Sequence, residues 1–95
     1  MRYDARADAN QAEIVAALRE IGATVTDLHR VGGGCPDLLV GYRGVNYLLE
    51  VKTEDGEFTP KEADWFLTWH GQRAVVHTIA EALAVLGMPY IGVEP

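Results

Sequence analysis

The hydrophobic and polar positions of this chain follow two different periods, which divide it into helices and strands. From Asn10 to about Ile21 the apolar residues recur at helical spacing and Gly22 follows, so this stretch predicts a helix. Two more helical stretches begin at Thr59 and Thr78. Short runs rich in β-branched and aromatic residues predict four strands, at Thr24–His29, Leu38–Tyr42, Val45–Val51 and Ala74–His77. This order predicts an α/β fold, with a mixed sheet and helices packed on it.

Each predicted helix opens with a polar residue and a glutamate three positions later, the pattern of a capping box. The three pairs are Asn10 with Glu13, Thr59 with Glu62, and Thr78 with Glu81. In the second helix Pro60 takes the first helical position, where its missing N–H costs nothing. Capping therefore explains Glu13 and Glu62 without any function, and a functional role for either competes with it.

The strands on either side of Arg43-Gly44 form a predicted hairpin that gathers charged residues at one end. Because successive side chains of a strand point to opposite faces, Glu50 and Lys52 share one face, on the order of 7 Å apart. Asp37 immediately precedes the neighbouring strand and can converge on them. Two carboxylates suit a hard cation, and a lysine supplies or removes a proton, so this cluster suits a hydrolytic site.

Length and composition bound the rest of the interpretation. The 95 residues, 48% hydrophobic and 23% charged, predict one small domain over residues 1–95, with a core of about 10–87 and an apolar tail over 88–95. The single Cys35 excludes an intramolecular disulfide and fits a reducing cytosol. The first ten residues contain no apolar run, so we expect no signal peptide, no membrane span and a cytoplasmic location. The net charge of −6 argues against a broad electrostatic contact with nucleic acid but permits a local basic site or a bound cation.

Several residues together resemble the PD-(D/E)xK nuclease superfamily: Glu13, Asp37 and the Glu50-Val51-Lys52 triplet. Closer still, the run from Gly32 to Leu39 and the turn at Phe58-Thr59-Pro60 resemble the small stand-alone VRR-NUC domains of phages and bacteria. The resemblance covers roughly residues 10–87. It implies a restriction-endonuclease-like α-β-β-β-α-β core. At one position the chain departs from the family, because many relatives carry a glutamine where Glu62 stands here.

The resemblance also implies a mechanism. In the family, the aspartate of the PD pair, the glutamate of the ExK triplet and the main-chain carbonyl of its middle residue ligate Mg²⁺ or Mn²⁺; these are Asp37, Glu50 and Val51. Lys52 would orient or deprotonate the attacking water and stabilise the pentavalent phosphorane, and Glu13 would act through a metal-bound water. The implied function is a metal-dependent DNA endonuclease in phage or bacterial replication, recombination or repair.

The substrate and the assembly follow from the same resemblance. Stand-alone members are similar to junction-resolving enzymes, which are small and dimeric. We therefore expect a homodimer, in a bacterial or phage-infected cell, that binds branched DNA such as a junction or flap better than linear DNA. His29 and Arg30, just before the glycine run, are candidate phosphate contacts. Gly33 and Gly34 either let a DNA backbone approach the metal or form a flexible connection.

The candidate residues also have structural explanations. Asp37 can be a turn residue after proline, and Glu50 and Lys52 can be an exposed strand pair of little energetic meaning. Trp65 and Trp69, four residues apart, favour a core or interface stripe over a base-stacking platform.

Two other classes of function stay open. A catalytically silent DNA- or protein-binding module fits the acidic net charge and the glutamate at position 62, but it has no need of Asp37, Glu50 and Lys52 together. A small-molecule hydrolase lacks a nucleophile elbow or an HExxH motif. Cys35 is interpreted as a small packed residue, because no histidine or helix N-terminus is evidently placed to make it a thiolate.

Overall fold

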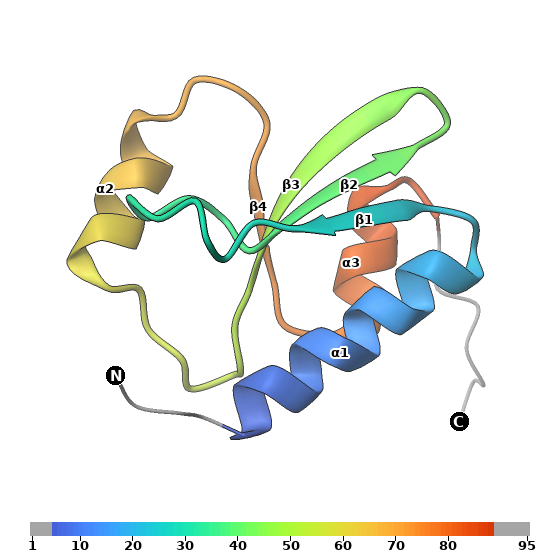
Figure 1. The fold of residues 1–95 in the computed structure, drawn as a ribbon, viewed down its shortest axis with the longest axis horizontal. Helices are drawn as coiled ribbons and strands as arrows, with labels where there is room; N and C mark the ends of the chain where they lie inside the picture. Colours follow the sequence, from blue (N-terminus) through green and yellow to red (C-terminus); the bar gives the residue numbers. More distant parts are fainter. Residues whose placement is uncertain (1–4, 89–95) are drawn as a thin grey trace.

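Four strands form one mixed sheet, and the first and last helices pack together beside it (Figure 1). The computed structural model describes residues 5–88. Its elements are α1 (Ala5–Glu20), β1 (Thr24–Asp27), β2 (Leu38–Tyr42), β3 (Val45–Val51), α2 (Pro60–Thr68), β4 (Ala74–Val76) and α3 (Ile79–Val85). The predicted α-β-β-β-α-β order with a final helix is confirmed, as is the mixed sheet of a restriction-endonuclease-like fold.

The strands lie in the sheet in their sequence order. β1 pairs with β2 and β2 with β3, both antiparallel, and β3 pairs with β4 in parallel. The β2–β3 hairpin turns at Arg43 and Gly44, whose φ angles of 52° and 81° are both positive. A two-residue turn of this kind has the twist that the flanking strands need, so the hairpin register is fixed at Tyr42 opposite Val45.

The core lies between the sheet and the α1–α3 pair. Ile14 and Leu18, one turn apart on α1, are completely buried. They belong to a cluster with one set of alternate residues from β2 and β3: Leu38, Val40, Leu49 and Val51. From β4 and α3 the cluster takes Val76, Ala82, Leu83 and Leu86. The same alternation turns Glu50 and Lys52 to the other face of the hairpin, as the sequence predicts.

The first helix begins earlier than predicted. Asn10 is not an N-cap, because α1 already runs from Ala5. The stretch before Asn10 contains three alanines and no glycine or proline, so its propensity extends the helix. The Asn10 side chain instead donates to the main-chain carbonyls of Lys52, at 3.4 Å, and His77, at 3.1 Å. The predicted capping box of Asn10 and Glu13 is therefore wrong, and Asn10 ties α1 to the ends of β3 and β4.

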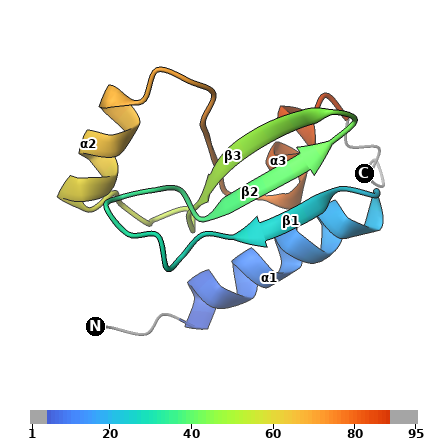
Figure 2. The ribbon, with the colours of Figure 1, turned by 45° about the horizontal axis from the view of Figure 1, so that its top comes forward.

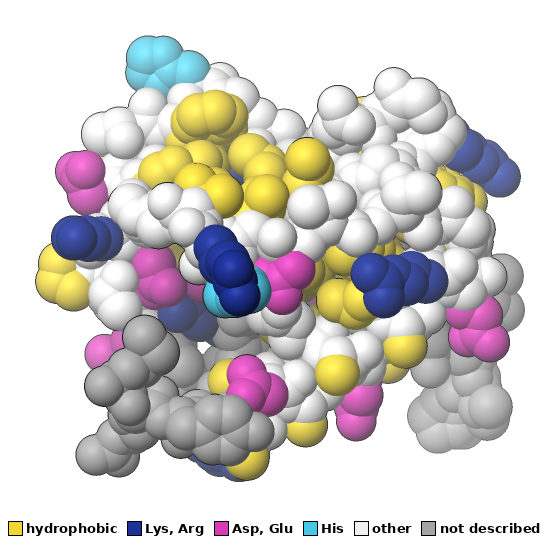
Figure 3. All heavy atoms as spheres, in the orientation of Figure 1, with side chains coloured by type: hydrophobic (Ala, Val, Ile, Leu, Met, Phe, Trp, Pro, Cys, Tyr) yellow, Lys and Arg dark blue, Asp and Glu magenta, His cyan; other side chains and the backbone are white. Residues whose placement is uncertain are grey.

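The second helix stands apart from this core. Figure 2 shows α2 beyond the end of the strands, and none of its residues is buried. Trp65 and Trp69 stack on each other with ring centroids 4.6 Å apart, and Trp69 is 44% exposed. The two tryptophans are thus not a core stripe. Trp69 also lines a shallow hollow with Leu39 and Leu48 on the sheet, where Figure 3 shows hydrophobic side chains gathered on the surface.

Smaller differences concern the ends of elements. β1 stops at Asp27 rather than His29, because the Asp27 carboxylate accepts the His29 main-chain N–H at 2.8 Å and turns the chain. α2 ends at Thr68, with Trp69 as its C-cap. Of the predicted apolar tail, Met88 packs against the core, and residues 89–95 lie outside the described part of the chain. Among residues 5–88, no helix combines the length and apolarity needed to cross a membrane.

Candidate active site

The candidate site lies where β2 begins and β3 ends. Asp37, directly before β2, accepts a hydrogen bond at its Oδ2 from the Val51 main-chain N–H at 2.8 Å. This bond replaces a rung of the ladder, because the β2–β3 register of Leu38 opposite Leu49 would place Pro36 opposite Val51. Proline has no N–H and cannot donate to the Val51 carbonyl. The Pro-Asp pair thus anchors one carboxylate at the strand end, and Pro36 itself makes no ladder bond to the Val51 carbonyl.

Glu50 is the most deeply buried charged residue of this cluster, with 3% of its surface exposed. Burial raises its pKa to about 8, and the neighbouring Asp37 and Glu62 carboxylates act in the same direction, whereas Lys52 opposes them. Burial also raises the pKa of Asp37, against the lowering effect of the Val51 N–H and Lys52. Glu50 is thus no exposed strand residue, but a carboxylate that needs a compensating positive charge in order to ionise.

Lys52 lies between two carboxylates. Its Nζ is 2.8 Å from Glu62 Oε1 and 3.4 Å from Glu50 Oε2, and 16% of its side chain is exposed. Burial alone would lower the pKa of Lys52, but the hydrogen bond to Glu62 and the charge of Glu50 carry it above its ordinary value. The ammonium therefore stays charged and is held between the Glu50 and Glu62 carboxylates.

Glu62 belongs to α2 and caps that helix. Its Oε1 accepts the Thr59 main-chain N–H at 2.9 Å, and its own N–H donates to Thr59 Oγ1 at 3.2 Å. The capping box predicted for Thr59 and Glu62 is confirmed. Burial would raise the pKa of Glu62, but hydrogen bonds from Lys52 and the Thr59 N–H lower it overall. Capping and contact with Lys52 are therefore simultaneous, and the sequence pattern showed only the first.

A cavity of about 580 Å³ opens over these residues and includes Asp37, Glu50, Val51, Lys52 and Glu62 in its lining. Five acidic residues line it, namely Asp8, Asp37, Glu50, Glu57 and Glu62, against the single ammonium of Lys52, so the cavity carries an excess of negative charge. Within residues 5–88, no three His, Cys, Asp or Glu side chains are grouped as a complete metal site. Asp37 and Glu50 bring two carboxylates to this cavity and Val51 also lies in its lining, and oxygen donors of this kind suit a hard divalent cation that retains several waters.

A solved structure described as a VRR_NUC domain is similar to this chain, with a TM-score of 0.67 and 25% sequence identity. The match covers 92% of this chain and 100% of that one. The chain forms a VRR-NUC-like domain. No protein-family model and no curated protein sequence matches it. The likeness indicates a nuclease-like domain, for which DNA is the expected partner.

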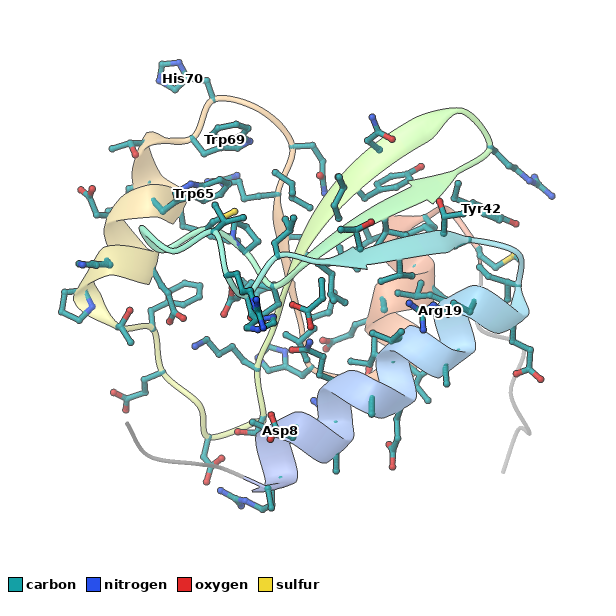
Figure 4. The ribbon with its side chains drawn as sticks, viewed as in Figure 1. Asp8, Arg19, Tyr42, Trp65, Trp69 and His70 are labelled. Carbon is teal, nitrogen blue, oxygen red and sulfur yellow. The ribbon has the colours of Figure 1, made fainter. Side chains whose placement is uncertain are left out.

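The α1 side of the VRR-NUC-like domain differs from the sequence prediction. Asp8 and Gln11 line the cavity, whereas Glu13 is exposed and does not. Glu13 follows Gln11 by two residues, which is a rotation of about 200° around the helix axis. Its side chain therefore lies on nearly the opposite side of α1. Figure 4 shows Asp8 at the beginning of α1, well before Arg19 along the helix. The alanine-rich start of the helix was the missed signal, because extending the helix to Ala5 puts Asp8 and Gln11 one turn apart on one side.

The glycine run of the VRR-NUC-like domain is a packed loop as well as a connection. Gly32, Gly33 and Gly34 all have positive φ angles, from 68° to 85°. A Cβ on Gly34 would collide with the Lys61 main-chain carbonyl of α2, whereas one on Gly33 would meet nothing within 4 Å. The missing side chain of Gly34 therefore lets the loop touch the first turn of α2, whereas Gly32 and Gly33 both have open space around them.

The loop residues before the glycines are exposed. His29 Nδ1 lies 2.8 Å from Asp27 Oδ1, and Arg30 follows it. The Leu28 N–H donates to the Asp37 carbonyl at 2.8 Å, which keeps this loop next to the start of β2. His29 and Arg30 thus sit beside the candidate site without lining its cavity.

Cys35 of the VRR-NUC-like domain is half-buried near the same carboxylates. Burial raises the pKa of its thiol, and the charges of Glu50 and Asp37 raise it further. A thiol that resists deprotonation is a poor nucleophile, which agrees with its interpretation as a packed residue.

Proposed function

We propose that this VRR-NUC-like domain is a metal-dependent endonuclease that hydrolyses phosphodiester bonds of DNA. The observation that carries the proposal is the buried Glu50 beside Asp37 and Lys52, at a cavity of a nuclease-like domain. A binding module has no use for a carboxylate that is costly to bury. A hydrolytic metal site needs such a carboxylate, because a buried carboxylate that borders a cavity is available to bind a cation.

Mg²⁺ or Mn²⁺ is the proposed cofactor, held by Asp37, Glu50 and the Val51 carbonyl. The donor chemistry fits, since all three are oxygen ligands, and the excess of carboxylates over Lys52 leaves charge for a cation to neutralise. When bound, the ion would lower the pKa of a water and neutralise charge on the phosphate. The chain's own part is to hold these oxygens at one strand end, with Asp37 fixed by the Val51 N–H.

Lys52 is the proposed donor to the reacting phosphate or water. Its two carboxylate neighbours keep it protonated, which favours stabilising negative charge over removing a proton. Its side chain lies over the Phe58 ring, with Nζ 5.5 Å from the ring centroid, which further restricts its position. We therefore assign electrostatic stabilisation and water orientation to Lys52, and no general-base role.

DNA binding would depend on a few cations near the cavity. Arg30 and Lys61 lie close to the loop and to the start of α2, whereas Arg43 is at the hairpin turn, at the other end of the strands. With a net charge of −6, one chain offers a small basic surface. We propose a homodimer that prefers branched DNA, because two copies double these contacts. Leu67 of α2 and Trp69, the C-cap residue that follows it, are exposed and support association.

The test is cleavage of labelled linear, flap and four-way-junction DNA by purified protein with Mn²⁺, Mg²⁺, Ca²⁺ or EDTA. We expect nicks or cuts with Mn²⁺ and Mg²⁺, none in EDTA, and far slower turnover with Ca²⁺, whose coordination geometry is looser. Full activity in EDTA would refute the metal mechanism. Tight DNA binding without cleavage under every condition would instead support the silent binding module. Light scattering on the same samples tests the homodimer.

A further inference from the structure

The contact between Glu62 and Lys52 joins an element outside the core to the candidate reaction centre. The 2.8 Å bond from Lys52 Nζ to Glu62 Oε1 is shorter than its 3.4 Å contact with Glu50. The Glu62 side chain is only 23% exposed, and so is less screened than a surface partner. Glu62 is therefore the principal partner of the ammonium.

One oxygen of Glu62 carries both of its roles. Oε1 accepts the Lys52 ammonium and also the Thr59 main-chain N–H, at 2.8 and 2.9 Å. The helix cap thus fixes the carboxylate, and the fixed carboxylate in turn places the ammonium. A lysine side chain has four rotatable bonds, so a single anchored acceptor removes much of its freedom.

The first turn of α2 is held in place although the helix has no buried residue. Gly34 of the glycine loop packs on the main chain of Lys61 and Glu62 so closely that no Cβ would fit. Farther along the helix, Arg73 Nε donates to the Phe66 carbonyl at 3.0 Å. The position of Glu62 therefore depends on a local contact at the start of α2, close to the loop that also leads into Asp37.

We propose that Glu62 is the positioning residue for Lys52, and that it couples the cap of α2 and the glycine loop to the placement of the ammonium over the reacting phosphate. The proposal rests on the proposed nuclease function for its kinetic consequences, but not for the contact itself. Glutamine, which many members of the resembled family carry at this position, also offers an Oε1 that can accept both bonds.

Kinetic measurements on two substitutions of Glu62 test whether it positions Lys52. Glu62→Gln keeps an Oε1 acceptor, so we expect kcat within about threefold of the wild type, since geometry is retained. Glu62→Ala removes it and should lower kcat about tenfold or more, with little change in KM, since a misplaced catalytic group is costly. Glu81→Ala is the matched control, because Glu81 is also the glutamate three residues after a threonine cap, on α3, and lies outside the cavity. It should leave kcat unchanged.

A second readout does not need nuclease activity. The chain has two lysines, Lys52 and Lys61, so selective ¹⁵N labelling of lysine gives two ammonium signals that Lys61→Arg assigns. Lys61 is exposed, whereas Lys52 is held between carboxylates. We expect slow proton exchange for the Lys52 ammonium in the wild type and in Glu62→Gln, and fast exchange in Glu62→Ala.

These outcomes decide between positioning and capping alone. Wild-type kcat in Glu62→Ala, or a loss in Glu81→Ala as large as in Glu62→Ala, overturns the proposal. So does a Lys52 signal that exchanges as fast in the wild type as in Glu62→Ala. If Glu62→Ala does not fold, fast Lys52 exchange in wild type and Glu62→Gln alone overturns it, and slow exchange supports it. If no DNA is cleaved but the Lys52 signal is protected, the nuclease function fails while the contact stands.

Discussion

The Asp37 carboxylate accepts a hydrogen bond from the Val51 main-chain N–H at 2.8 Å. This bond stands where the register would place the next main-chain hydrogen bond between β2 and β3. This bond makes the two residues one unit: it orients the carboxylate and fixes the strand end whose carbonyl is the third proposed ligand. It also explains why the aspartate follows a proline. Pro36 interrupts the main-chain hydrogen bonds of the ladder at the place where the Asp37 side chain supplies a bond instead.

Substitutions at Asp37 separate its charge from this hydrogen bond. Asp37→Asn keeps an oxygen that accepts the Val51 N–H, so its melting temperature should stay close to that of the wild type. Asp37→Ala loses the bond, at a cost of about 1 kcal/mol. Both should lose Mn²⁺ binding by calorimetry and at least about a hundredfold in cleavage rate, as when an essential group is removed. A cleaving Asp37→Asn would exclude the carboxylate as a ligand.

Pro36 itself provides a second test. Pro36→Ala restores an N–H opposite Val51, and that N–H competes for the carbonyl proposed to face the cation. We expect weaker Mn²⁺ binding in calorimetry, by about tenfold if one ligand is partly occupied, since each 1.4 kcal/mol is a factor of ten. The variant also loses side-chain volume in the core, because Pro36 is fully buried. Unchanged Mn²⁺ affinity in a folded variant would remove Val51 from the ligand set.

Much of this arrangement is predictable from local sequence. The turn at Arg43-Gly44 sets the hairpin register, and the period of two then places Glu50 and Lys52 on one face. The Thr59–Glu62 cap is equally local. Contacts between different elements are not predictable in this way. Lys52 and Glu62 are ten residues apart, and no strand or helix period relates them.

The first helix shows the other limit of local patterns. Asn10 and Glu13 match a capping box, yet favourable helix residues before them carry the helix to Ala5. The longer helix adds Asp8, one turn before Gln11, to the residues that line the cavity, whereas Glu13 lies on another side of α1 and is exposed. A motif alone does not terminate a helix when the preceding residues also favour one.

The burial of Glu50 predicts how stability depends on pH. Its pKa is about 8 in the folded chain and near 4.5 when exposed, so between these values the folded state keeps a proton that the unfolded state has lost. Raising the pH through this window therefore destabilises the metal-free protein. Asp37 contributes with the same sign, and the lowered pKa of Glu62 acts oppositely but below this window.

Thermal melts in EDTA from pH 5 to pH 8 measure this effect. The wild-type melting temperature should fall with pH, and Glu50→Gln should have a flatter profile and exceed the wild type at pH 8. Mn²⁺ should raise the wild-type melting temperature most at pH 8, where Glu50 ionises readily. Parallel wild-type and Glu50→Gln profiles would show that Glu50 does not carry the pH dependence.

Replacement of Lys52 tests the assignment of charge stabilisation. Lys52→Ala should lose at least about a hundredfold in rate while Mn²⁺ binding is retained, because lysine is not a ligand. Its removal leaves Glu50 and Glu62 without their shared cation, so the melting temperature in EDTA should also drop at pH 8. Calorimetry that shows no Mn²⁺ binding by a folded Lys52→Ala would instead make Lys52 a structural support for the carboxylates.

The glycine loop offers a test with a matched pair. Gly33→Ala and Gly34→Ala both place a side chain at positive φ, 68° and 85°, which costs roughly 1–2 kcal/mol. Only Gly34 faces the α2 main chain, so Gly34→Ala adds a collision with the Lys61 carbonyl and must push the loop and the helix apart. We expect a lower melting temperature for Gly34→Ala than for Gly33→Ala, together with faster exchange of the Lys52 ammonium, because Glu62 moves with the helix. If the two variants have equal melting temperatures and equal exchange, the close contact between loop and helix does not hold the site together.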